Sequence, residues 1–238
     1  MVKKAFIFDL DGVIVDTAKF HFIAWQRLAA SLEIKFTEHE NEQLKGVSRV
    51  HSRQKILEWG NIKISPDVFQ AKMDQKNEEY LDLIKSLDTS DIMPGVHDFL
   101  LNLKEQEQPI ALGSASKNAR PILKKLGILH LFEVIVDGTN VTEAKPDPEV
   151  FLHASRQLNF AVQESIVFED SVAGVQAANA AGMISIGLGE KKILHEADED
   201  FTQFKDMPKD YINTTLSKKK RICHSYKSDA TDELHRKE

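Results

Sequence analysis

The chain has 238 residues, of which 42% are apolar and 29% are charged, and its formal net charge is -6. This length and composition allow an ordinary buried core, either as one large domain or as a core with a smaller insert. The acidic balance gives no support to nucleic-acid binding, which needs a basic face. An anionic substrate would therefore be held by local cations rather than by a positive field over the whole molecule.

The cysteine count and the N-terminal residues bear on the compartment. Cys223 is the single cysteine, so no internal disulfide can form, which fits a reducing cytoplasm. Residues 1–8 run directly into acidic residues and lack the apolar stretch of a signal peptide. No run approaches the length of a membrane span, and no long exposed apolar stripe stands out. We therefore expect a cytoplasmic monomer without a membrane partner.

Five short apolar runs have the character of strands buried on both faces of a parallel sheet. They cover residues 5–8, 110–113, 134–136, 165–168 and 184–187. Helical patterns precede each of the last four runs, at residues 99–103, 121–126, 150–158 and 172–181. Because helices that alternate with strands place the strands parallel, the pattern predicts an α/β protein with a doubly wound, Rossmann-like sheet.

The rhythm changes between residues 16 and 92, where no strand-like run occurs and several helical patterns follow one another. Aromatic and leucine side chains recur at helical spacing around Trp25. We expect residues 16–92 to form a helical cap, inserted into a core that consists of residues 1–15 and 93–216. No internal repeat is visible in either part.

The pattern weakens after residue 190. A final strand and helix are hard to recognise there, and the candidates for packing on the core are Ile193, Leu194, Phe201 and Phe204. Residues 217–238 contain a short basic run and then mostly polar residues. Such a composition is typical of a disordered tail.

Carboxylates directly follow two of the predicted strands. Asp9 and Asp11 come after the first strand, and Glu169 and Asp170 come after the fourth. In open α/β sheets, ligands bind beyond the carboxyl ends of the strands. Four acidic groups that meet there would repel one another without a cation, and hard oxygen ligands suit Mg²⁺. The pattern therefore predicts a Mg²⁺ site rather than two unrelated acidic turns.

The first acidic pair has a spacing that suits phosphoryl transfer. Asp9 stands where the strand ends, so its side chain is held rigidly, and a carboxylate can attack phosphorus to form an aspartyl phosphate. Asp11 lies two residues later and points to the same side if the extended chain continues. It can therefore handle a proton while Asp9 attacks. Gly12 allows the backbone to turn sharply after the pair.

Two further strand-end features complete a phosphate site. Ser114 follows the second strand, and its hydroxyl together with the Ala115 amide can donate hydrogen bonds to a phosphoryl oxygen. Lys145, next to Pro146, can neutralise charge on the transferring group and on Asp9. Phosphoryl transfer needs mostly positioning and charge stabilisation, so this set is sufficient in kind.

In chain order, these residues resemble the four motifs of the haloacid dehalogenase superfamily. The matching residues are Asp9-Leu10-Asp11-Gly12-Val13, Ser114, Lys145-Pro146 and Glu169-Asp170, and the resemblance extends over about residues 4–190. It implies a Rossmann-like core, Mg²⁺ and an aspartyl-phosphate intermediate. It also implies that the backbone carbonyl of Asp11 is a metal ligand beside the side chains of Asp9, Glu169 and Asp170.

A short loop in the predicted cap carries two cations around a glycine, namely Lys45, Gly46 and Arg49. Arginine can bind a phosphate with two hydrogen bonds, so an arginine on the cap would create a second phosphate site facing the first. A phosphatase of monophosphates has less use for such a site than a mutase, whose bisphosphate intermediate binds in two orientations. The loop also resembles the substrate loop of the β-phosphoglucomutases.

Residues at the start of the predicted cap match the same family. Thr17 is expected at the hinge near the acid/base group, and the resemblance implies that His21 helps to align Asp11. Trp25 fits the core of the cap better than a platform for the sugar, although both interpretations stay open. Lys76-Asn77 and Tyr80 also match the family pattern.

The loop after the second strand continues the resemblance. Ser116, Lys117 and Asn118 follow Ser114 and Ala115. They are expected to contact the second phosphate or the sugar hydroxyls. Asn118 has a competing role as the N-terminal cap of the following helix.

The resemblance implies an isomerase that interconverts β-glucose 1-phosphate and β-glucose 6-phosphate, with glucose 1,6-bisphosphate as intermediate and activator. A sugar-phosphate phosphatase with the same chemistry is the alternative. A non-catalytic sugar-phosphate-binding protein is disfavoured, because Asp9, Asp11 and Lys145 are all retained. The chain departs from the family at Gly113, where many relatives have alanine, and after Gly189, where the final elements are hard to recognise.

Overall fold

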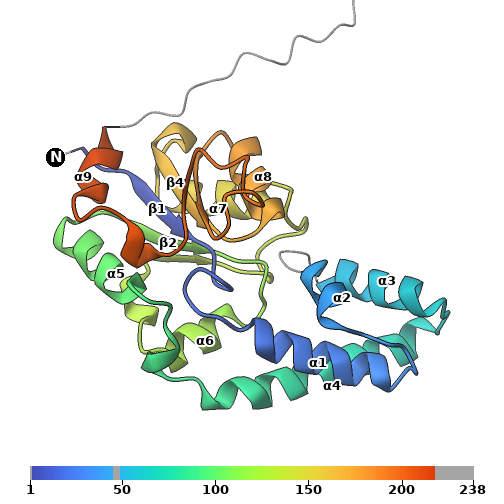
Figure 1. Ribbon diagram of the computed structural model, residues 1–238. Helices are drawn as coiled ribbons and strands as arrows, with labels where there is room; N and C mark the ends of the chain where they lie inside the picture. Colours follow the sequence, from blue (N-terminus) through green and yellow to red (C-terminus); the bar gives the residue numbers. More distant parts are fainter. Residues whose placement is uncertain (1, 45–48, 218–238) are drawn as a thin grey trace, which may run out of the picture.

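The computed structural model describes residues 2–44 and 49–217, apart from the side chains of residues 49, 50 and 216. Figure 1 shows a twisted sheet with helices on both faces and a further group of helices beside it. The six strands are parallel and lie in the order β3-β2-β1-β4-β5-β6. They are β1 Ala5–Phe8, β2 Ile110–Gly113, β3 Val134–Val136, β4 Ser165–Glu169, β5 Ile184–Leu188 and β6 Glu199–Phe201. The predicted fold class and its five strands are confirmed.

The central strand, β1, lies between β2 and β4, with Phe6 opposite Ile110 on one side and Ile166 on the other. All of its residues are fully buried. A strand that is covered on both faces needs apolar side chains at every position, which explains the continuous run in the sequence. Phe8 also stacks on Phe168 of β4, with ring centroids 4.8 Å apart.

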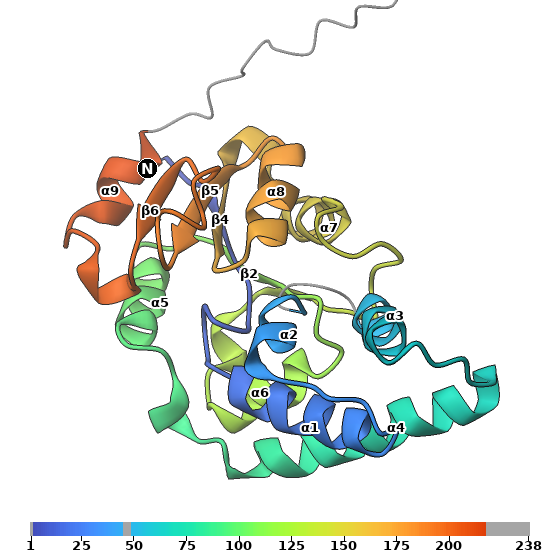
Figure 2. The same cartoon turned by 45° about the vertical axis from the view of Figure 1, so that its right-hand side comes forward.

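Helices cover both faces of the sheet, as Figure 2 shows. Successive side chains of a strand point to opposite faces, so Phe6 and Phe8 belong to one hydrophobic cluster and Ile7 to another. The first cluster includes residues of α5 (Val96–Glu105), α6 (Ala119–Lys125) and α9 (Tyr211–Leu216). The second includes residues of α7 (Glu149–Gln157) and α8 (Val172–Ala180).

The helices between β1 and α5 contribute to a third hydrophobic cluster, which includes Trp25, Ile56 and Phe69, although Phe20 and Tyr80 of the same helices belong to the first cluster. They are α1 Ala18–Ala30, α2 Glu38–Glu42, α3 Arg49–Gly60 and α4 Pro66–Leu83. We call this group the helical insert. Its two connections to the sheet lie side by side, because Val15 pairs with Ile92 in an antiparallel bridge. The predicted limits of the cap, residues 16 and 92, fall beside this bridge, and the division into core and cap stays a prediction.

Among the described residues, no helix is long and apolar enough to cross a membrane. Short 3-10 helices complete the connections between the elements. The 3-10 helices are η1 Ile84–Ser86, η2 Thr89–Asp91, η3 Leu129–Leu131, η4 Val162–Glu164 and η5 Phe204–Asp206.

The segment after residue 190 contains structure that the sequence patterns did not reveal. β6 pairs with β5, with Glu199 opposite Ile186, and it consists of Glu-Asp-Phe. It was missed because it is a short, half-exposed edge strand and so has no apolar run. Of the residues expected to pack on the core, Leu194 and Phe204 are buried, but Ile193 is 54% exposed. The predicted tail lies outside the described residues except for Ser217, which is exposed.

Candidate active site

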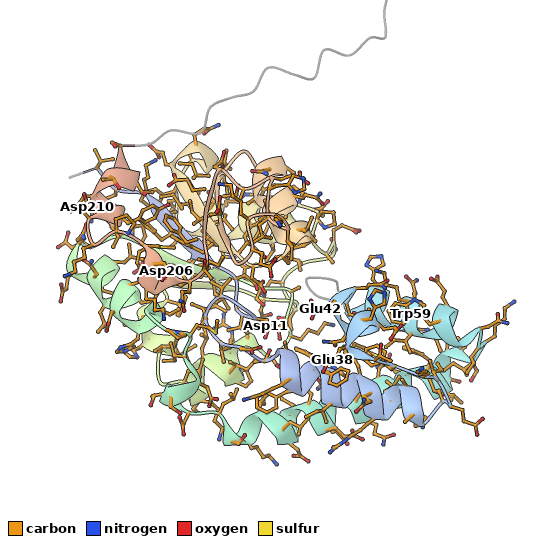
Figure 3. The ribbon with its side chains drawn as sticks, in the orientation of Figure 1. Asp11, Glu38, Glu42, Trp59, Asp206 and Asp210 are labelled. Carbon is orange, nitrogen blue, oxygen red and sulfur yellow. The ribbon has the colours of Figure 1, made fainter. Side chains whose placement is uncertain are left out.

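The acidic residues predicted at two strand ends meet at one edge of the sheet. Asp9 follows β1, and Glu169 is the last residue of the neighbouring β4, so parallel pairing brings both to the same end. Carboxylate oxygens of Asp9, Glu169 and Asp170 lie within 4.8 Å of one another. Asp11 lies between the sheet and the helical insert (Figure 3). Such a set of hard oxygen donors fits Mg²⁺.

One buried cation sits among these carboxylates. Lys145 Nζ donates a hydrogen bond to Asp9 Oδ1 at 2.6 Å and another to Glu169 Oε1. The Lys145 side chain is 2% exposed. Burial by itself lowers the pKa of Lys145, but the two carboxylates outweigh it and hold that pKa above its ordinary value. Lys145 therefore stays protonated and can balance charge on a transferring phosphoryl group.

A single lysine does not balance the acids. The pKa of Asp9 is raised from 3.8 to about 7, mainly by burial; Lys145 opposes this rise and the neighbouring Glu169 contributes to it. Burial also raises the pKa of Asp170, with Glu169 again adding to the effect. Carboxyl groups that are costly to ionise together are what a divalent cation would stabilise. The residues present thus fit the implied Mg²⁺.

Two glycines allow the carboxylates to approach so closely. Gly12 has a φ of +84°, and a Cβ at this position would overlap the carboxylate of Asp170. A Cβ on Gly174, in the first turn of α8, would overlap the carboxylate of Glu169. Gly174 was missed as a functional residue, and its signal was a glycine near the start of a helix, five residues after a strand-end acid. Ser171 is the N-terminal cap of this helix, and its hydroxyl accepts a hydrogen bond from Gly174 N at 3.0 Å.

Asp11 is in contact with Thr17, whose predicted role as a hinge residue stays a prediction. The Thr17 hydroxyl donates a hydrogen bond to Asp11 Oδ1, and Thr17 is fully buried. Burial raises the pKa of Asp11, while the Thr17 hydrogen bond opposes that change. A raised pKa makes the Asp11 carboxyl a better proton acceptor than an ordinary carboxylate, which suits an acid/base group.

The insert contributes a buried lysine near Asp11, to which the sequence patterns assign no role. Lys76 on α4 is 3% exposed, and its Nζ lies 4.1 Å from the ring centroid of Trp25 and 3.3 Å from His21 Nδ1. The His21 ring stacks on Tyr80 with centroids 4.2 Å apart. Trp25 is 4% exposed and packs in the cluster of the insert, in agreement with the interpretation as cap core. Lys76 also lowers the pKa of Asp11, so its charge acts on the site.

The loop after β2 is ordered by its own serines. Ser114 Oγ accepts a hydrogen bond from Ser116 N at 3.1 Å, and Ser116 Oγ accepts one from Asn118 N at 3.2 Å. Ala115 and Ser116 are half-buried and Lys117 is exposed. The competing role of Asn118 as a side-chain cap is wrong: this residue stands at the N-cap position of α6, but its side chain makes no capping hydrogen bond. Its amide is instead bonded to Asn77 of α4, at 3.1 Å.

The predicted second phosphate site falls largely outside the described residues. Lys45 and Gly46 lie outside them, and Arg49 begins α3 with a side chain that is also outside them. Lys55 Nζ of α3 donates a hydrogen bond to the Gln43 carbonyl at 3.1 Å, so this helix contacts the chain just before the cap loop. The structure therefore brings together the predicted core residues, while the role of the cap loop stays a prediction.

Comparisons with known proteins identify the family of the chain that carries this site. Residues 3–182 match the model of the haloacid dehalogenase-like hydrolase family. The chain belongs to this family. Family membership and the acidic cluster together imply dependence on Mg²⁺.

Two relatives and one solved structure resemble this chain over most of its length. The chain is 40% identical to a β-phosphoglucomutase of Bacillus subtilis over 86% of its own length and 91% of that protein. It is 33% identical to a phosphorylated carbohydrates phosphatase of Thermotoga maritima, over 82% of the chain and 91% of that protein. A crystal structure of β-phosphoglucomutase from Clostridium difficile superposes with a TM-score of 0.87 at 39% identity, over 90% of the chain and 97% of that structure.

Proposed function

We propose that this protein is a β-phosphoglucomutase, an isomerase that interconverts β-D-glucose 1-phosphate and β-D-glucose 6-phosphate. The observation that carries the proposal is the 40% identity to a β-phosphoglucomutase across 91% of that enzyme. The geometry of the strand ends supports it, because Asp9 stands beside a buried lysine and a cluster of carboxylates. Together these features suit covalent phosphoryl transfer.

In the first half-reaction, phosphorylated Asp9 transfers its phosphoryl group to the C6 hydroxyl of β-glucose 1-phosphate. The bond from Asp9 Oδ to phosphorus breaks as the new oxygen–phosphorus bond forms, and Asp11 accepts the hydroxyl proton. The products are the free Asp9 carboxylate and β-glucose 1,6-bisphosphate. Lys145 remains charged throughout and offsets negative charge on the equatorial oxygens and on Asp9.

In the second half-reaction, the bisphosphate is bound in the opposite orientation. Asp9 attacks the phosphorus at C1, and Asp11 returns its proton to the departing C1 oxygen, so β-glucose 6-phosphate leaves and the aspartyl phosphate is restored. Asp9, Glu169, Asp170 and the Asp11 carbonyl would hold Mg²⁺, which supplies charge neutralisation for the phosphoryl oxygens. The amide of Ala115 and the hydroxyl of Ser114 would bind the same oxygens.

The helical insert serves as the cap in this proposal. Lys45, Gly46 and Arg49 would bind the phosphate that is not reacting, together with Ser116, Lys117 and Asn118. Thr17 and His21 would align Asp11, and closure of residues 16–92 over the core would exclude water. Exclusion of water is what separates transfer to a sugar hydroxyl from hydrolysis.

The remaining parts of the proposal concern partners and compartment. Glucose 1,6-bisphosphate would act as activator, because it phosphorylates an unmodified Asp9. The enzyme would work as a cytoplasmic monomer on small sugar phosphates and would not bind nucleic acid, in line with its net charge of -6 and its single cysteine.

A coupled assay of glucose 6-phosphate formation tests the function directly. It uses purified protein, Mg²⁺, β-glucose 1-phosphate and a trace of glucose 1,6-bisphosphate, with the α-anomer and released phosphate as parallel readouts. We expect rapid isomerisation of the β-anomer with little phosphate released. Phosphate release without isomerisation would refute the mutase.

A sugar-phosphate phosphatase is the second candidate. The 33% identity to a phosphorylated carbohydrates phosphatase favours it, since the two activities share the same Asp9 and Asp11 chemistry and differ in whether water or a sugar hydroxyl accepts the phosphoryl group. In that case the cap cations, Lys45 and Arg49, would select the substrate rather than hold a bisphosphate. The assay above separates the two.

A further inference from the structure

A side-chain contact joins the helical insert to the loop after β2. Asn118 Nδ2 donates a hydrogen bond to Asn77 Oδ1 at 3.1 Å. Asn118 belongs to the core and Asn77 to α4, 41 residues earlier in the chain. Asn118 is 7% exposed, so water has little access to replace this partner. Loss of a shielded hydrogen bond has a larger effect than loss of one on the surface.

Asn118 is also the last member of a series of hydrogen bonds within the loop. Its backbone N–H donates to Ser116 Oγ, and the N–H of Ser116 donates to Ser114 Oγ. Ser114 is itself fixed to the sheet, because its N–H donates to the Val136 carbonyl at 3.0 Å. The position of the Asn118 side chain is therefore linked to the whole phosphate loop, from the end of β2 to the start of α6.

The same turn of α4 also carries Lys76, whose charge acts on Asp11. Lys76, directly before Asn77, has a buried ammonium group near His21 and exerts its charge on Asp11. The hydrogen bond between Asn77 and Asn118 thus helps to fix the position of this turn of α4 relative to the loop after β2 and to Asp11. An exposed amide on the same helix would have no such effect.

We propose that Asn77 is a positioning residue, which orients Asn118 and with it residues 116–118 for binding the non-reacting phosphate and the sugar. The proposal rests on the proposed function for the identity of the sugar phosphate. Asn77 acts through Asn118 and does not touch the reacting atoms.

Steady-state kinetics of four variants test this role. We expect Asn77→Ala to raise the KM for β-glucose 1-phosphate about three- to tenfold and to change kcat less than about twofold, since one shielded hydrogen bond is lost from the binding surface. In the Asn118→Ala background, adding Asn77→Ala should change KM less than about twofold. Gln70→Ala is the matched control: Gln70 is an exposed amide on α4, with a 2.9 Å hydrogen bond to Asp74, and this variant should behave as wild type.

The proposal is overturned if Asn77→Ala leaves KM unchanged, or if the effects of the two asparagine changes simply multiply in the double variant, because then Asn77 does not act through Asn118. A second readout needs no turnover: hydrogen exchange at the amides of Ser116 and Asn118 should be faster in Asn77→Ala than in Gln70→Ala. Equal exchange in these two variants would overturn it as well.

The kinetic comparison holds for either reaction, because the KM ratio is defined for phosphate release as for isomerisation. A wild-type protein that releases phosphate without isomerisation would thus refute the mutase and leave the role of Asn77 to be judged by its own tests. Thermal unfolding of each variant identifies any loss of fold.

Discussion

The core side and the insert side of the site are built in different ways. On the core side, the register of β1 and β4 brings Asp9 and Glu169 together, and Gly174 leaves room for the Glu169 carboxylate. On the insert side, Lys76 and Asn77 reach the site from a single helix through side-chain contacts. The core side is therefore fixed by backbone geometry, whereas the insert side depends on the packing of α1 and α4. Changes in the core should affect chemistry and metal binding, and changes in the insert should affect substrate binding.

The largest effect is expected at Asp9. Asp9→Asn removes the nucleophile and one metal ligand, so both isomerisation and phosphate release should fall at least about a thousandfold. The assay is glucose 6-phosphate formation with the phosphate readout, and Asp98→Asn on the exposed face of α5 is the matched control. Activity near the wild-type level in Asp9→Asn would disprove the covalent mechanism.

Gly174→Ala tests whether backbone room on the core side matters. The added methyl group would overlap the Glu169 carboxylate and displace a metal ligand, so we expect the Mg²⁺ concentration for half-maximal activity to rise about 10- to 100-fold. Ala180→Gly, the reverse exchange at an exposed position of the same helix, should lower thermal stability without changing the Mg²⁺ requirement. An unchanged Mg²⁺ requirement in Gly174→Ala would contradict this account of the glycine.

The pH dependence of stability should reveal the crowded carboxylates. The pKa of Asp9 is raised from 3.8 to about 7 by folding without metal, so the folded state binds more protons than the unfolded state between these values. Stability of the metal-free protein should therefore fall as pH rises from about 4 to about 7. Mg²⁺ competes with those protons, so the increase in Tm on adding it should be larger at pH 8 than at pH 5. Scans in EDTA and in Mg²⁺ measure both, and an equal Mg²⁺ effect at the two pH values would contradict the prediction.

The smallest kinetic effect is expected for a substitution of Trp25. This substitution decides whether Trp25 belongs to the core of the insert or is a platform for the sugar. As part of the insert's core, Trp25→Phe should lower Tm by about 2–6 °C through lost packing, with the KM for β-glucose 1-phosphate within about twofold of wild type. A large rise in KM without a change in Tm would instead indicate a platform for the sugar. Tm and KM measured on the same preparation give the answer.

Much of the core could be predicted because its signals are local. A strand that is buried on both faces must be apolar throughout, and this marked all of the first five strands. Parallel strands end at the same edge, so the order of strands and acids along the chain was enough to place Asp9 and Glu169 together. β6 escaped because the edge of a sheet tolerates Glu199 and Asp200, which leave no apolar pattern.

The sequence alone determined the fold class and the position of the carboxylates, Lys145 and Ser114 near strand ends, because each rests on residue type and order along the chain. Tertiary structure decided the rest: that the side chain of Asn118 bonds Asn77 instead of capping α6, and that the ammonium of Lys76 lies beside His21. These contacts join segments 41 and 55 residues apart. No local pattern encodes such contacts, because they depend on how the insert packs against itself and on the core.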